Sequence, residues 1–267
     1  MVINTLKTIT NSTDIKQGIT LAAATSAIKI IKNTKTFINI WDIAIGNKLE
    51  AWNQKSIFKN QQDIENYKNE YLNKISQIPS EKFQEPKLSV IGPALEASKF
   101  YIEEKEIRLL FVNLISSSMN SNFNSRLHHS FVEIIKQLSP YDAKILSTLD
   151  SNPQPIVDII IKKGTTDGIL YFEGICTLYQ NLYFSDSISE NDSNNISIDN
   201  LIRLNLINLI PSGLTNSELY NHYLDSNTFK SLSNRFPDQT LTIQKMAIQL
   251  TSFGEAFKNI CCEQISE

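Results

Sequence analysis

The sequence predicts a mostly α-helical protein: an N-terminal helical region, then a helical core, then a winged-helix-like C-terminal module with a short β-ribbon. Three observations support this fold class. Hydrophobic residues make up 41% of the 267 residues, which is enough for a substantial core. Glycine and proline number only eight each, which disfavours a turn-dense β-sandwich or barrel. Several long segments also place apolar residues at helical spacing.

Residues 15–45 predict two amphipathic helices, with Ile19, Ala23 and Ala27 on the apolar face of the first and Phe37 and Trp41 on that of the second. These faces can dock on the rest of the protein, bind a membrane surface or form an oligomer interface. The most apolar stretch, residues 18–31, is too short to cross a bilayer alone, because a span needs roughly 20 apolar residues.

The middle of the chain predicts a helical core. Residues 61–78 read as a surface helix with Tyr67, Tyr71 and Ile75 on its apolar side, and residues 79–90 read as a connector. From Pro93 to Met119 the pattern predicts one long helix, of which residues 107–115 are apolar on nearly every side. This segment is expected to be the central core helix.

Local patterns predict where several further helices begin. Ser130 with Glu133, and Ser252 with Glu255, have the spacing of a capping box, in which a side chain at each position bonds the other's backbone amide. Ser139 is expected to open another helix, because a proline follows it at the first helical position and an acid lies in the first turn.

The last part of the chain is less regular. Residues 169–184 are rich in aromatic and β-branched side chains, so helix and strand cannot be separated by periodicity, and residues 185–195 are expected to be a polar, locally disordered loop. A helix near residues 198–204 should end at Asn205, and residues 239–251 predict two short strands with a turn at residues 244–246. The predicted domains are 1–87, 88–138 and 139–267.

Four segments of the chain resemble the bacterial abortive infection alpha family. They are residues 91–120, 128–146 (HHSFVEIIKQLSPYDAKIL), 200–207 (NLIRLNLI) and 250–261 (LTSFGEAFKNIC), in the family's order. Two positions depart from the pattern: His129 replaces a usual proline, and Asn205 replaces a usual glycine. The resemblance implies a role in defence against phage, in which an infected cell stops growing or dies. It implies no particular reaction.

Five residues stand out as possible functional or signature positions. His128 is interpreted as a capping or core-orienting residue rather than a metal ligand, because a metal needs three or four spaced ligands. Glu104 and Arg108 have the four-residue spacing of a helical ion pair, and Glu103 adjoins them. Arg203 is the one cation on the helix that would enter a DNA groove. The pattern indicates no catalytic, cofactor-binding or metal-binding set, so enzymatic activity is the minority hypothesis.

The charge distribution bears on which class of partner the chain can bind, and the cysteine content bears on its cellular compartment. Lys and Arg outnumber Asp and Glu by 17 to 13 up to Leu138, but are outnumbered by 15 to 8 from Ser139 onward. The winged-helix-like module is therefore acidic, which disfavours DNA binding because a DNA-contacting face is usually basic. Three cysteines and the absence of a secretory pattern lead us to expect a cytoplasmic protein.

The leading functional hypothesis is a defence protein that acts through contacts with a protein partner or with itself, without cofactor or identified small-molecule substrate. One alternative is a membrane-acting effector that uses residues 15–45 peripherally at the inner membrane. A second alternative is a nucleic-acid-binding regulator that uses the winged-helix-like module.

Overall fold

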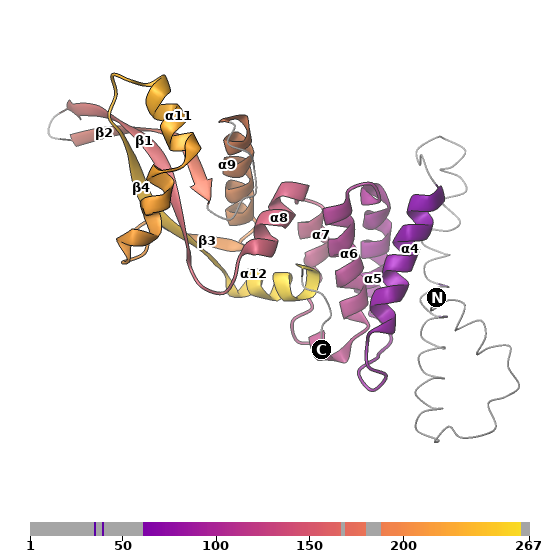
Figure 1. Ribbon diagram of the computed structural model, residues 1–267. Coiled ribbons are helices and arrows are strands. Elements are labelled where there is room, and N and C mark those ends of the chain that lie inside the picture. The colour runs from indigo at the N-terminus through magenta and orange to yellow at the C-terminus, as the bar shows by residue number, and fades with distance from the viewer. Residues whose placement is uncertain (1–34, 36–38, 40–60, 167–168, 180–187, 263–267) are drawn as a thin grey trace, which may run out of the picture. The chain divides into compact units, whose positions relative to one another are not determined.

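The computed structural model describes residues 35, 39, 61–166, 169–179 and 188–262 (Figure 1). Apart from residues 35 and 39, the amphipathic helices expected within residues 15–45 therefore lie outside the described residues. The chain forms two compact units: the first contains Met1–Gln137 and Asn259–Glu267, and the second contains Leu138–Lys258. The predicted domains 1–87, 88–138 and 139–267 stay a prediction. No helix within the described ranges is long and apolar enough to cross a membrane.

The described part of the first unit is helical. Its elements are α4 (Gln61–Ser76), α5 (Leu88–Ser98), η2 (Lys99–Tyr101), α6 (Lys105–Ser118), η3 (Ser121–Phe123) and α7 (Phe131–Ile135). In Figure 1, α6 lies beside both α4 and α5. The predicted helix at residues 61–78 is confirmed by α4, whose Tyr67, Tyr71 and Ile75 are buried as expected.

The prediction of one long helix from Pro93 to Met119 is wrong. Pro93 lies inside α5, and the chain turns through η2 before Glu104, whose extended backbone precedes α6. A straight helix of that length would extend for about 40 Å and could not fold its second half against its first. The turn allows α5 and α6 to pack on each other. The core helix expected at residues 107–115 is confirmed, because most of α6 is buried.

Polar side chains on α6 bind the backbone of residues 260 and 261, where the chain returns to the first unit. Asn113 Nδ2 donates a hydrogen bond to Cys261 O at 2.7 Å, and Ser117 Oγ donates one to Ile260 O at 3.1 Å. These carbonyls belong to a π-helical turn, Lys258–Cys262. The buried polar groups of α6 thus satisfy backbone acceptors that lack partners within a regular α-helix.

The second unit combines helices with one antiparallel sheet. Its elements are α8 (Pro140–Thr148), β1 (Gln154–Thr166), β2 (Ile169–Tyr179), α9 (Ile188–Arg203), β3 (Ile207–Ile210), η4 (Ser217–Tyr220), α10 (Asn221–Leu224), α11 (Asn227–Arg235), β4 (Leu241–Leu250) and α12 (Ser252–Phe257). The strand order is β2-β1-β4-β3. The described residues are mostly helical, as predicted.

Three local expectations for this unit need correction or completion. The ambiguous residues 169–179 form β2, the second strand of a hairpin with β1. The two short strands expected at residues 239–251 are wrong, because β4 is one continuous strand between β1 and β3. The loop expected at residues 185–195 is also wrong from Ile188 onward, where α9 begins. The winged-helix-like character of 139–267 stays a prediction.

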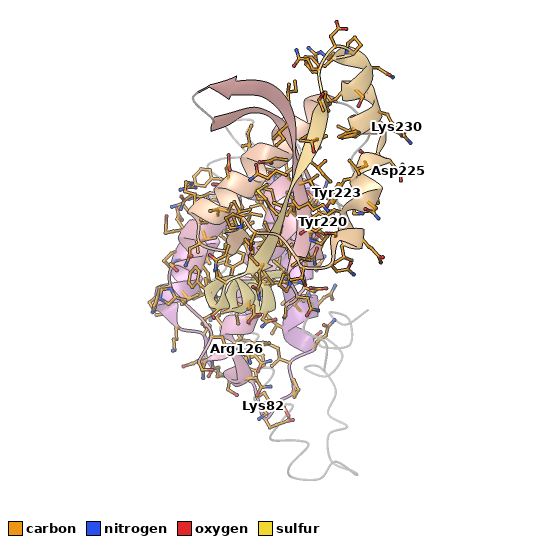
Figure 2. All side chains as sticks on the ribbon, turned by 90° about the vertical axis from the view of Figure 1, so that its left-hand side faces the viewer. Lys82, Arg126, Tyr220, Tyr223, Asp225 and Lys230 are labelled. Carbon is orange, nitrogen blue, oxygen red and sulfur yellow. The ribbon has the colours of Figure 1, made fainter. Side chains whose placement is uncertain are left out.

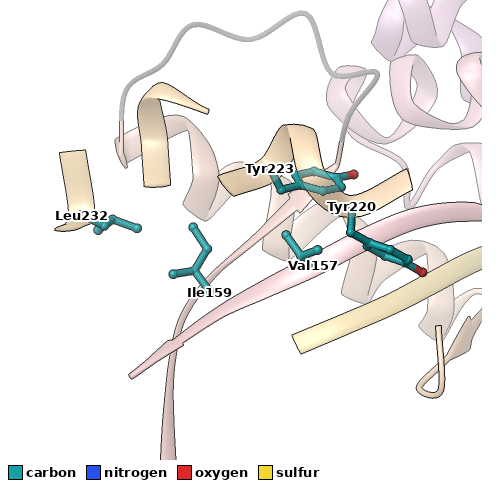
Figure 3. Close-up of a cluster of buried hydrophobic side chains, with 5 residues drawn as sticks. All are labelled: Val157, Ile159, Tyr220, Tyr223 and Leu232. Carbon is teal, nitrogen blue, oxygen red and sulfur yellow. The ribbon is translucent and has the colours of Figure 1, made fainter. Parts of the chain in front are cut away.

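Tyrosines fasten η4 and α10 to the sheet. Tyr220 and Tyr223 pack with Val157, Ile159 and Leu232 in a buried cluster (Figure 3). The Tyr220 hydroxyl donates to Met246 O of β4 at 2.8 Å and accepts from Leu214 N at 2.7 Å. The Tyr223 hydroxyl donates to Pro155 O of β1 at 2.7 Å. Each ring therefore buries apolar area while its hydroxyl stays hydrogen-bonded. Figure 2 shows both tyrosines on the helical segment beside the sheet.

Candidate functional site

Three of the four segments that carry the family resemblance meet in the second unit. The first contact is at the start of α8, where Ser139 and Asp142 form a capping box. Ser139 Oγ accepts from Asp142 N at 3.1 Å, and Asp142 Oδ2 accepts from Ser139 N at 2.7 Å. Pro140 occupies the first helical position, where its missing amide costs nothing. The prediction that Ser139 opens this helix is confirmed, and the reciprocal bond from Ser139 N to Asp142 adds a capping box that the sequence analysis did not predict.

The buried carboxylate of Asp142 also joins α8 to α9. Asn200 Nδ2 donates to Asp142 Oδ2 at 2.9 Å. Arg203 in turn donates to Asn200 Oδ1, from Nε at 3.1 Å and from Nη2 at 2.7 Å. The amide of Asn200 therefore links an exposed guanidinium to a buried carboxylate. Arg203, predicted as the possible groove-reading cation, bonds a residue of its own helix.

Asn205 ends α9 in the left-handed conformation, with φ of 56°. Asn205 N donates to Ile202 O and Leu206 N donates to Leu201 O, both at 2.9 Å, which is the hydrogen-bond pattern of a Schellman motif. The prediction that the helix stops here is confirmed. Asparagine is the residue that best replaces glycine in this conformation, so the departure from the family pattern is accommodated.

The start of α12 packs against this same turn. Thr251, one residue before the expected Ser252, is the cap: its Oγ1 accepts from Gly254 N at 2.8 Å and donates to Asn205 O at 2.7 Å. Thr251 N donates to Leu206 O at 3.1 Å. We call the contact of Ser139, Asp142, Asn200, Arg203, Asn205, Leu206, Thr251 and Gly254 the signature junction.

Gly254 is required by the closeness of this packing. A Cβ at residue 254 would lie 1.9 Å from Leu206 O and 2.8 Å from Leu206 C, far inside any contact distance. Both neighbours are backbone atoms, which cannot rotate away as a side chain can. The position therefore excludes every residue with a Cβ unless α12 moves away from the end of α9.

The remaining predicted residues lie in the first unit. Arg108 pairs with Glu70 of α4 rather than with Glu104, through Nε–Oε2 at 3.0 Å and Nη2–Oε1 at 2.9 Å. Arg108 Nη1 also donates to Ile102 O. Glu104 precedes α6, where its carbonyl accepts from Arg108 N, while the side chains of Glu103 and Glu104 are exposed.

Two tyrosines on α4 form a polar pair that the sequence did not identify as a site. Tyr67 and Tyr71 are fully buried, and their hydroxyl oxygens lie 2.5 Å apart. Burial raises the pKa of both phenols well above the ordinary value, so both stay protonated. They cannot serve as general bases at neutral pH. Their four-residue spacing was the available signal, and it indicated only an apolar face.

His128 holds the turn before α7. Its Nδ1 accepts from Ser130 N at 3.2 Å and lies 2.6 Å from Ser130 Oγ. The capping box expected between Ser130 and Glu133 is wrong, because Ser130 makes no side-chain cap and Glu133 pairs with Lys136. His128 Nδ1 is therefore engaged by Ser130 in the turn that precedes α7.

The described residues hold no group of three or more His, Cys, Asp or Glu side chains that could bind a metal. Cys261 is buried, and burial raises the pKa of its thiol, while Cys262 is partly exposed. Among the five predicted residues, Glu104 and Arg108 contact each other through the backbone hydrogen bond from Arg108 N to Glu104 O.

Comparison with known proteins identifies one family. The family model described as Abortive infection alpha matches residues 59–261. That range includes all four segments on which the resemblance rests. Neither the curated proteins nor the solved structures contain a significant match.

Proposed function

The chain belongs to the abortive infection alpha family, and on this premise we propose that it takes part in abortive infection, a bacterial defence that stops growth of a phage-infected cell. We propose further that it acts in the cytoplasm through contacts with a protein partner or with a second copy, rather than by catalysis. A partner could be a product of infection or a component the cell needs for growth.

The signature junction is the observation that carries this proposal. Its polar side chains bond to neighbouring elements of the same unit: Asp142 to Asn200, Asn200 to Arg203, and Thr251 to the carbonyl of Asn205. A catalytic site would instead aim such groups at a common point in a cleft. The polar side chains of the signature junction therefore hold α8, α9 and α12 together.

The same contacts weigh against DNA binding. Arg203 would be the cation of a groove-reading helix, but its guanidinium is bonded to Asn200 Oδ1 of the same helix. Phosphate contacts need several available cations. Within this proposal, the winged-helix-like module is a scaffold.

The experiment is a phage-challenge plating assay with the chain expressed in a bacterial host. We expect fewer plaques and lower survival of infected cells than with an empty vector. Gly254→Ala should abolish protection because it disrupts the signature junction, whereas Gly92→Ala, where an added Cβ meets nothing within 4 Å, should retain it. Purified chain that hydrolysed nucleotides or cut nucleic acid would contradict a non-catalytic mode of action.

A further inference from the structure

We draw no further inference here: the strongest candidate, the surface patch on η4 and α10 where Leu219 and Leu224 are each 43% exposed, carries none because nothing in the structure shows what covers it.

Discussion

Replacing Gly254 with alanine should destabilise the protein. The same replacement at Gly92, the other glycine that the structure describes in an α-helix, should not. The new Cβ would lie 1.9 Å from Leu206 O, which is roughly 1.5 Å inside ordinary carbon–oxygen contact. Because Leu206 O belongs to the backbone, α12 must shift. The shift would stretch the 3.1 Å bond from Thr251 N to Leu206 O and the 2.7 Å bond from Thr251 Oγ1 to Asn205 O.

The expected cost combines two effects. Overpacking of this kind costs about 1–3 kcal/mol, and weakening one hydrogen bond adds roughly 1 kcal/mol. The sum, about 2–4 kcal/mol, is a large part of the roughly 5–15 kcal/mol by which domains are stable. Urea unfolding followed by circular dichroism gives the change in free energy of unfolding. Amide hydrogen exchange in β3 and α12 tests whether the loss is centred on the signature junction.

Gly92→Ala is the control, because it lies in α5 and an added Cβ meets no atom within 4 Å. It should stabilise the protein by about 0.5–1 kcal/mol, since alanine favours helix over glycine. If Gly254→Ala were as stable as the parent chain, the argument from close backbone packing would be refuted. The same would hold if both variants changed stability equally.

Three further predictions concern other contacts. Tyr220→Phe should lower the free energy of unfolding by about 1–3 kcal/mol in denaturant titration, since Met246 O loses its donor; no change would mean that this hydroxyl is dispensable. His222 is partly buried, and this burial lowers its pKa, so the unfolded chain binds its proton more readily. Stability should therefore fall as pH drops below about 6.5, and His222→Gln should flatten this slope in pH-dependent melting. Arg108→Lys should cost about 1–2 kcal/mol in urea unfolding despite its retained charge, because an ammonium cannot form the two parallel bonds to Glu70; equal stability would show that charge alone suffices.

The sequence predicted best what is encoded by neighbours along the chain. Ser139 and Asp142 are three residues apart, and the cap they form depends on little else. Asn205 could be recognised as a helix end because few residues tolerate the left-handed conformation. In both cases the physical cause lies within one turn of helix, so the pattern is sufficient.

The sequence failed where a distant residue supplies the partner. Arg108 has Glu104 at the ideal helical spacing, yet it pairs with Glu70, 38 positions away, because the turn at η2 leaves Glu104 outside α6. Residues 188–195 were expected to be disordered from their polar, acidic composition, yet they form the first half of α9. The signature junction could not be derived because its parts come from three separated segments.

The return of residues 259–262 to the first unit has a consequence for synthesis on the ribosome. The carbonyls of Ile260 and Cys261, which accept bonds from Ser117 and Asn113, are made only after every residue of the second unit. The usual sequence of events, in which the earlier-made domain folds first, cannot finish here. The second unit is complete while the first still waits for its last turn, so a stalled or shortened chain leaves α6 with buried polar groups and no acceptors to bind.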